Sequence, residues 1–312
     1  MKILFVLLQI LFVPILSPLV IGVVRKIKAR MQNRHGAAIT QPYFDLWKLF
    51  HKDEVISTDA SWIFKLVPYF IFTITLILPL GFPVLSTLNV FPYMSDFLVI
   101  IYLIALSTFF LALAGIDVGS AFGGFGSSRE MTLTALTEGA FVFSLLSPAF
   151  LAHTTNVVEM TATLQTLSIA QPSHLLPMVL AFFSFLAVLL AETKRFPFDN
   201  PATHLELTMI HEAMILEYSG KRLALIEWAA FNKFLFFIVL GMNVFFPWSV
   251  AVHLTGTSLL YSLGWLLVKV GAVAAFVAIL ESSVAKYRFF RLPDVLLAAF
   301  IFGVISLVLG AL

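Results

Sequence analysis

Acidic residues gather in one stretch of the sequence, between two apolar segments. A carboxylate shielded from water has a raised pKa and can exchange protons near neutral pH, and a histidine does so without any shift. Protonatable side chains at this density could therefore hold and pass protons. The members of this acidic stretch are Glu192, Asp199, Glu206, Glu212 and Glu217, together with His204 and His211.

The spacing within the acidic stretch predicts a helix from residue 203 onwards. Glu206 and Glu217 are eleven residues apart, which is about three helical turns, so they share a face. Pro197 and Pro201 interrupt any helix before that point. We expect protonatable groups stacked along one line, in preference to a solvated cytoplasmic helix. No HExxH spacing occurs, so we expect no metal site.

Further charged residues lie inside apolar segments, where each needs a partner or water. Glu138 follows Glu130 by eight residues, about two helical turns, and so lies on a similar face. It is either a functional group or a structural one held in a salt bridge. Together with the acidic stretch, these residues could form a polar track for protons or ions into the membrane. The track's additional members are Glu138, Glu227, Lys233, Lys269 and Glu281.

Basic and aromatic residues mark a second segment, 25–54. Pro42 can begin a helix on which Phe44, Trp47 and Phe50 share one face. This pattern predicts an amphipathic helix lying at the membrane surface. The helix is either a simple interfacial anchor or part of a grip on a peripheral subunit. The basic residues of such a grip are Arg30, Arg34 and Lys48.

Five glycines crowd a third segment, residues 115–130. They suit a backbone packed closely against a neighbour and argue against a membrane span there. Ser127, Ser128 and Glu130 predict that the fourth span begins only after them. The segment lacks the lysine of a P-loop and follows no strand, so it is not a phosphate site.

The amino-acid composition indicates that these segments belong to a membrane protein. The 312 residues are 60% hydrophobic and 12% charged, with a mean hydropathy of +1.00, whereas soluble domains carry about 25% charged residues. These values exclude a soluble enzyme, a disordered chain and a nucleic-acid binder. The sequence has no cysteine, so this chain can form no disulfide and hold no thiolate-bound iron–sulfur cluster, nickel or zinc.

Eight segments are long and apolar enough to span a bilayer, and in lipid they must be helices. We therefore expect an all-α integral membrane protein with eight transmembrane helices and an amphipathic surface helix after the first. Residues 1–312 are expected to form a single transmembrane domain. The expected spans are roughly 3–24, 62–85, 94–116, 131–153, 174–192, 223–247, 258–281 and 293–312.

Lysine and arginine alternate between the loops. They occupy loops 25–61 and 193–222, the loop with Arg129 before the fourth span, and the last loop before the final span, whereas 86–93, 154–173 and 248–257 have none. The positive-inside rule then predicts basic loops in the cytoplasm and both termini outside the cell membrane. The sequence has no fixed-period repeat, which argues against a transporter built from matching halves.

Three motifs together resemble a known family. Residues 191–199 read AETKRFPFD, a Glu-Leu pair follows at 206–207, and EYSG stands at 217–220. This order resembles the AExxRxPFD, Glu-Leu and EYSG pattern of subunit 1 (the H subunit) of respiratory complex I and its relatives in membrane-bound group 4 [NiFe]-hydrogenases. The loop after the first span is similar to the same family's RxQxRxGP…QPxxDxxKL pattern. It matches at Arg30, Gln32, Arg34, Gly36, Gln41, Pro42, Asp45, Lys48 and Leu49.

Departures from the pattern favour one branch of that family. Ala37 stands where complex I has proline, and the Glu-Leu pair lies farther from EYSG than in complex I. The phrase FGGFGSSRE at 122–130 looks like the corresponding loop of the hydrogenase anchors. The chain is thus most similar to the membrane anchors of formate hydrogenlyase and hydrogenase-4 complexes.

The resemblance implies an anchoring and coupling subunit without a catalytic centre of its own. Its partners would be hydrogenase-like large and small subunits, iron–sulfur subunits and antiporter-like membrane subunits, and the [NiFe] and iron–sulfur clusters would lie in those partners. The alternatives are a quinone-chamber subunit of an NADH:quinone oxidoreductase, which would bind quinone, and a stand-alone ion transporter. Loops 25–61 and 193–222 would dock the peripheral subunits. The implied docking or chamber residues are Arg30, Arg34, Asp45, Lys48, Arg129, Glu130 and Arg195.

Overall fold

The computed structural model describes residues 2–88, 91–170, 174–199, 209–248, 250–252 and 255–311, and all regular elements there are helices. Eight of these helices are long and apolar enough to cross a membrane, which confirms the expected all-α class and the expected number of spans. The α-helices are α1 (Lys2–Met31), α2 (Gln41–Phe50), α3 (Trp62–Ile77), α4 (Phe97–Asp117), α5 (Ala121–Ala152), α6 (Val157–Ala170), α7 (Leu175–Glu192), α8 (His211–Ile215), α9 (Gly220–Phe245), α10 (Gly256–Ser283) and α11 (Leu292–Ala311).

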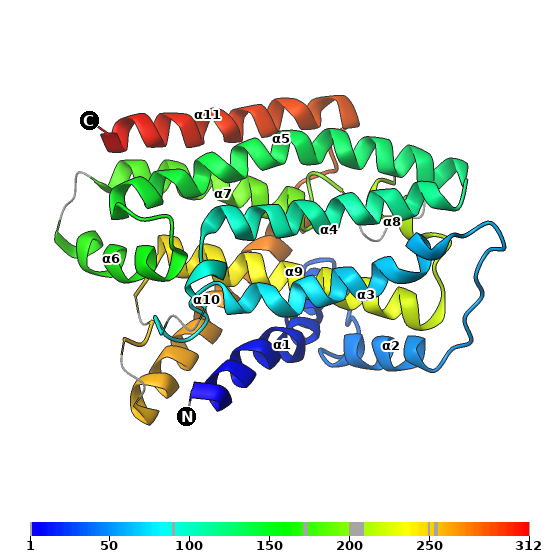
Figure 1. Cartoon of the computed structure of the whole chain (residues 1–312), viewed down its shortest axis with the longest axis horizontal. Helices are drawn as coiled ribbons and strands as arrows, with labels where there is room; N and C mark the ends of the chain where they lie inside the picture. Colours follow the sequence, from blue (N-terminus) through cyan, green and yellow to red (C-terminus); the bar gives the residue numbers. More distant parts are fainter. Residues whose placement is uncertain are drawn as a thin grey trace.

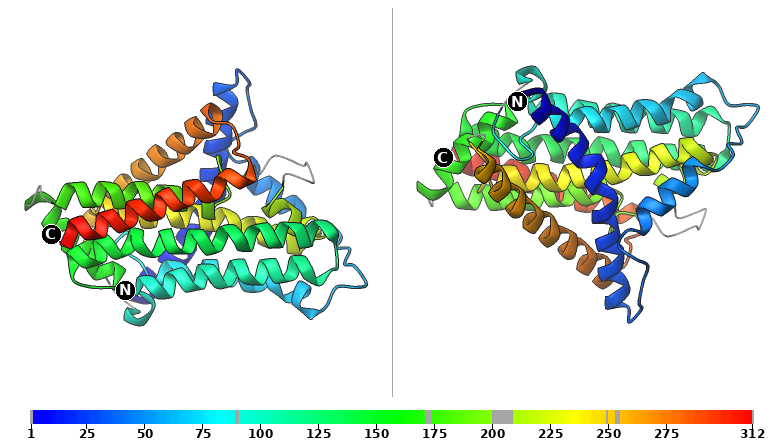
Figure 2. Two further views of the ribbon diagram at one scale, coloured as in Figure 1. Left: turned by 90° about the horizontal axis from the view of Figure 1, so that it is seen from above. Right: turned by 90° about the horizontal axis from the view of Figure 1, so that it is seen from below.

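The spans lie side by side, with α5 packed against α4, α7 and α11, and α9 packed against α1, α3 and α7 (Figure 1). Both ends of the chain lie toward one end of this bundle, and α2 and α8 lie toward the other. We call the latter the basic end, since it carries segments 25–61, 193–199 and 284–291. The opposite end is called the neutral end. Helix α10 diverges from α11 and packs instead against α1 and α9 (Figure 2).

The surface helix α2 forms where it was expected. Pro42 lies in its first turn, as its fixed backbone angle allows. Pro42 and Leu46 are buried against the bundle, whereas Phe44 and Trp47 are 64% and 67% exposed. Phe50 meets the ring of Trp228 edge-on, at 6.2 Å between centroids. One apolar side of α2 therefore holds the helix to the bundle, and two further aromatic side chains remain available to lipid or to a partner.

The expectation for the glycine-rich segment is wrong in one respect. Helix α5 begins at Ala121, so most of this segment is helical, and the start predicted near Ser127 does not occur. The glycines do pack closely, as expected. A Cβ at Gly123 would lie 2.1 Å from the carbonyl oxygen of Gly115, and one at Gly126 would lie 2.9 Å from the Cβ of Ala213. Tight packing against α4 and α8 therefore outweighs the low helix propensity of glycine.

The long helix expected from residue 203 is not continuous in the part of this segment that the structure describes. The described part of this segment begins at Met209, and only α8, residues 211–215, is helical. The backbone N–H of His211 donates to Asp199 Oδ2 at 3.2 Å, and this bond sets where α8 begins. His204 and Glu206 lie outside the described residues.

Aromatic rings fill the bundle between α5, α7 and α9. The ring of Phe141 lies 5.9 Å from that of Phe185 and 5.3 Å from that of Phe237, between centroids. Phe185 in turn lies 5.4 Å from Phe245. This apolar core holds the spans in register and thereby positions the polar side chains nearer the basic end.

Candidate functional site

A cavity of about 240 Å³ lies between the spans, toward the basic end. Its walls come from α1, α3, α4, α5, α8 and α9, from the last residue of α7 and from the turn that follows it. Charged and apolar side chains share these walls, which is unusual among helices that cross a membrane. The charged and imidazole-bearing members are Arg25, Glu130, Glu192, Lys194, Arg195, His211, Glu212, Glu227 and Lys233.

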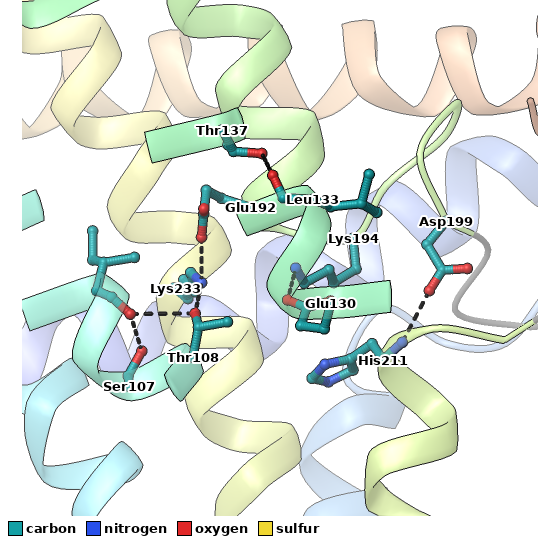
Figure 3. Close-up of polar contacts among 11 residues, drawn as sticks. Ser107, Thr108, Glu130, Leu133, Thr137, Glu192, Lys194, Asp199, His211 and Lys233 are labelled. Carbon is teal, nitrogen blue, oxygen red and sulfur yellow. Dashed lines mark hydrogen bonds and ion pairs between the residues drawn. The ribbon is translucent and has the colours of Figure 1, made fainter. Parts of the chain in front are cut away.

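The pair of Glu192 and Lys233 is the central contact of this cavity. Lys233 Nζ on α9 donates to Glu192 Oε2, at the end of α7, at 2.7 Å (Figure 3). It also lies 3.4 Å from the hydroxyl oxygen of Thr108 on α4. Glu192 is only 3% exposed. Of the two outcomes expected for Lys233, a partner or water, the structure shows a carboxylate partner inside the bundle.

A second ion pair joins Glu130 on α5 to Lys194 in the turn after α7 (Figure 3). Glu130 is fully buried, and its Oε2 has no hydrogen-bond partner among the described residues. Burial disfavours the charge on Lys194, but the carboxylates of Glu130 and Glu192 outweigh it and hold the pKa of Lys194 above its usual value. Glu130, grouped with the docking residues from the sequence, thus lies inside the cavity.

Two more ion pairs fasten the turn at residues 193–199 to the helices around it. Glu281 on α10 accepts from Arg195 at 3.1 Å and lies 2.8 Å from the Nζ of Lys28 on α1. Asp199 accepts from Lys286 at 2.6 Å. Three segments distant in the sequence therefore meet through charge here: α1, the turn itself, and the end of α10 with the residues that follow it. Arg195 lies inside the protein.

His211 and Glu212 are neighbours with opposite pKa shifts. Burial lowers the pKa of His211 to about 4, so its imidazole is neutral at neutral pH. Burial raises the pKa of Glu212 to about 7, and the nearby carboxylates of Glu227 and Asp199 add to this shift. Glu212 can therefore take up or release a proton close to physiological pH.

Three expected track residues lie elsewhere. Glu217 is exposed and follows the end of α8. Lys269 donates to the carbonyl oxygens of Phe246 and Trp248 at 2.7 and 2.6 Å, so it pairs with backbone and not with a carboxylate, because α9 ends beside it. Glu138 lines a separate groove on the outside of the bundle.

The residues expected to dock a peripheral subunit divide into two groups. Arg30, Arg34 and Lys48 are exposed at the basic end. Asp45 lies beside them, 3.3 Å from Arg25. Arg129, by contrast, stacks over aromatic rings of the protein and donates to a backbone carbonyl of residue 209 at 3.3 Å. The first group is open to a partner, whereas Arg129 stabilises the fold around α5 and α8.

Sequence reasoning missed a polar link across the bundle. Ser17 on α1 donates to Asn232 Oδ1 at 2.7 Å, and the amide of Asn232 donates to Thr75 on α3 at 3.1 Å. Asn232 adjoins Lys233 in the chain, and Thr75 lines the same cavity. A polar asparagine beside a lysine within an apolar span was the available signal.

The same link continues from α1 to the surface helix. Pro18 has no N–H, so the carbonyl of Pro14 has no donor within α1, and Trp228 Nε1 donates to it at 3.0 Å. One residue further along α1, the carbonyl of Ile15 accepts from the hydroxyl of Tyr43 on α2. The surface helix is thus hydrogen-bonded to the segment of α1 that contacts α9.

The fold and this site define a multi-pass membrane protein with ion pairs buried among its spans. Residues 2–311 match the NADH dehydrogenase family, and the chain belongs to that family. Its relatives include the hydrogenase-4 component C of Escherichia coli, 35% identical and covering 94% of this chain and 91% of the relative. Formate hydrogenlyase subunit 4 of the same organism is 30% identical and covers 99% and 98%.

A complex I protein is also related. The H subunit of NADH-quinone oxidoreductase from Syntrophotalea carbinolica is 31% identical, over 86% of this chain and 82% of the relative. A chain in the structure of the membrane-bound sulfane sulfur reductase, an archaeal respiratory membrane complex, has the same fold, with a TM-score of 0.84, 21% identity and 99% of both chains covered. The resemblance drawn from the sequence motifs is therefore confirmed.

Proposed function

We propose that the chain is the membrane anchoring and coupling subunit of a proton-coupled complex of the hydrogenase type. It would link redox chemistry in peripheral subunits to ion translocation in the membrane. The observation that carries this proposal is the Glu192–Lys233 pair in a polar cavity between the spans. The names of the relatives, hydrogenase-4 component C and formate hydrogenlyase subunit 4, support it.

The ion pairs of the cavity suit such a role because each carboxylate has more than one neighbour. Lys194 pairs with Glu130 and lies near enough to Glu192 for their charges to interact. A proton that reaches Glu192 removes the attraction for Lys233, and in a low-dielectric site such a change is large. The lysine can then move toward another acceptor, so protonation is converted into a shift of charge and structure.

A signal from the basic end has a continuous path to this pair. Tyr43 joins α2 to α1, Ser17 joins α1 to Asn232, and Asn232 precedes Lys233 in α9. A peripheral subunit that moves α2 would therefore shift the helix that carries Lys233. This arrangement supports mechanical coupling between the docking surface and the buried pair.

The remaining parts of the proposal concern partners and orientation. The basic end would face the cytoplasm and both termini the outside, as the distribution of lysine and arginine supports. The partners would be hydrogenase-like large and small subunits, iron–sulfur subunits and antiporter-like membrane subunits. The [NiFe] and iron–sulfur clusters would lie in those partners, since this chain has no cysteine to hold them.

Purification of the tagged chain from native membranes tests the docking role. We expect redox subunits carrying [NiFe]-ligating cysteines to co-purify. The variant Arg34→Ala should lose part of these peripheral subunits and keep the membrane subunits, because Arg34 is exposed at the basic end. An equally exposed arginine outside the two docking loops, changed in Arg288→Ala, is the control. A chain that purifies without redox subunits would contradict the proposal.

A quinone-reducing complex is the second candidate, and the family shared with the NADH-quinone oxidoreductase relative favours it. The cavity also has apolar walls, including Ile71, Leu111 and Phe231. Turnover with quinone as acceptor, blocked by cavity-binding inhibitors, would establish this candidate. Turnover that ignores quinone would exclude it. Ion flux by the chain alone in liposomes would instead indicate a stand-alone transporter.

A further inference from the structure

A groove of about 280 Å³ lies between α7 and α10, with α9 as its floor. Phe183 on α7 and Phe276 on α10 line it and are 54% and 44% exposed, so the groove is open on the outer side of the bundle. Every described residue that lines the groove is apolar, including Ile238 and Met242 on the floor. A space of this kind excludes water and takes up hydrocarbon.

Charged contacts on both sides of the groove hold α10 in place. Lys269 donates to two backbone carbonyl oxygens just after the end of α9, at 2.7 and 2.6 Å. Glu281 lies 2.8 Å from the Nζ of Lys28 and accepts from Arg195 at 3.1 Å. The part of α10 that lines the groove, residues 272–276, lies between these two fixed residues. Helix α10 cannot close onto α7 without breaking these contacts, so the groove is filled from outside the chain, since empty space forfeits dispersion attraction.

The segment 284–291 crosses the groove at the basic end. It joins α10 to α11, and α11 packs against α7 (Figure 2). The backbone N–H of Tyr287 donates to the carbonyl oxygen of Pro197 at 3.1 Å, so the segment lies over the turn that follows α7. Leu189, which lines the groove, stands three residues before the end of α7, about 5 Å along the helix axis. The groove therefore extends nearly to the level of this segment.

Two arginines of the same segment are available to an anion. Arg288 and Arg291 are exposed, and neither forms an ion pair with another described residue, whereas Lys286 is held by Asp199 at 2.6 Å. Phe290, between the two arginines, is 88% exposed, which is common for aromatic side chains at the interface of membrane and water. Guanidinium groups bind phosphate oxygens through two parallel hydrogen bonds. An anionic headgroup therefore fits this segment, at the level where an acyl chain enters the groove.

We propose that the groove is a binding site for an anionic phospholipid, with one acyl chain between α7 and α10 and the phosphate at Arg288 and Arg291. Charge identifies the occupant: a phospholipid carries its phosphate at the interface and its chain below it, whereas an apolar helix of another protein leaves the two arginines without a partner. The bound chain fills the space that α10 cannot close and so braces α10. The proposal goes beyond the proposed function, because it requires no redox subunit.

The amount of lipid that stays bound tests the groove. The chain is purified from native membranes with its complex and washed in detergent, and the remaining phospholipid is counted per chain by mass spectrometry. We expect anionic phospholipid to be enriched over its share of the membrane. Ala272→Phe fills the groove from α10 and should lower this amount at least fivefold, whereas Val268→Phe, at an exposed position of α10 outside the groove, should not. Retention of zwitterionic lipid alone, or equal retention in Ala272→Phe, would overturn the proposal.

Arg291→Ala tests the headgroup site and serves if Ala272→Phe fails to fold. Loss of one arginine contact should lower the retention of anionic phospholipid about fivefold. Lys221→Ala, an equally exposed basic residue on α9, is the control and should retain the lipid. Unchanged retention in Arg291→Ala would contradict the proposal.

Cross-linking identifies the occupant directly. A photoreactive amino acid at Phe276, which lines the groove, should label phospholipid. Labelling of a peptide from another protein would overturn the proposal. Absence of redox subunits from the complex would count against the proposed function alone, because lipid binding in the groove does not require them.

Discussion

The two ends of the bundle are built on different principles. Toward the neutral end, phenylalanine rings such as Phe185 and Phe237 fill the space between the spans. Toward the basic end, the same helices hold buried ion pairs around a cavity, with Glu192 and Lys233 at the centre. Apolar packing would have stabilised both ends more simply, because a buried ion pair contributes little net stability. The difference indicates that the charged region is kept for function and the aromatic region for structure.

Lys233→Met, in the charged region, is expected to have the largest effect on stability and on ion translocation. It leaves Glu192 buried without its partner, which should destabilise the protein by about 3–5 kcal/mol, and it should abolish coupled ion translocation. The measurements are thermal unfolding in detergent and ion uptake by liposomes that contain the complex. The double variant Lys233→Met/Glu192→Leu should regain most of the stability without regaining translocation. Recovery of both would show that the pair is only structural.

Phe237→Ala tests whether the aromatic region toward the neutral end serves structure alone. A fully buried phenylalanine replaced by alanine costs about 3–5 kcal/mol in soluble proteins, and we expect about 2–3 kcal/mol here because lipid tails are themselves apolar. The ratio of ions translocated to turnovers should stay unchanged in the folded fraction. A changed ratio would mean that the aromatic region also takes part in coupling.

The division between the two ends was only partly predictable from the sequence. The eight spans and the surface helix α2 follow from hydropathy and amphipathic spacing, which act locally. Glu192 and Lys233 were recognised as intramembrane charges, but 41 residues separate them, and only the packing of α7 against α9 brings them together.

The errors have physical causes. The glycines of α5 were taken to exclude helix because propensity favours that interpretation, yet their close packing against Gly115 and Ala213 reverses it. The long helix predicted from residue 203 rested on periodicity, whereas in the described residues from 209 onwards helix α8 begins only at His211, whose N–H bonds to Asp199. Asn232 beside Lys233 indicated a polar contact, but its partners Ser17 and Thr75 are distant in the sequence, and only the packing of α1 and α3 against α9 brings them together.

Tyr43→Phe sharpens the comparison by testing the path into the charged region. The change removes one hydrogen bond to Ile15 and should destabilise by about 1 kcal/mol. If α2 acts on Lys233 through α1, the ratio of ions translocated to turnovers should fall while turnover itself persists. Tyr261→Phe, at a side chain that is 63% exposed on α10, is the matched control and should leave the ratio unchanged. A ratio unaffected by Tyr43→Phe would break the proposed path.

The smallest expected effects are changes in how the stability of the protein depends on pH. Between pH 6.5 and about 4, unfolded His211 binds a proton that the folded protein excludes, so stability is lost as the pH falls through this range. Glu212 has the opposite sign: between pH 4.5 and about 7 the folded protein keeps a proton that the unfolded chain releases, so stability is lost as the pH rises. The two ranges overlap, so the two contributions oppose each other between about pH 4.5 and 6.5. In that range His211→Gln should leave a stability that falls as the pH rises, and Glu212→Gln a stability that falls as the pH falls. Unchanged profiles would show that neither group is buried as described.

The central claim is that Glu192 and Lys233 couple redox chemistry to ion movement. Its most direct test is the ratio of ions translocated to redox turnovers in liposomes that contain the complete complex, compared between the wild type and Glu192→Gln. The glutamine keeps the size of the side chain and can still accept from Lys233, so assembly should persist. We predict that turnover continues while ion translocation falls to background. A wild-type ratio in Glu192→Gln would contradict the account.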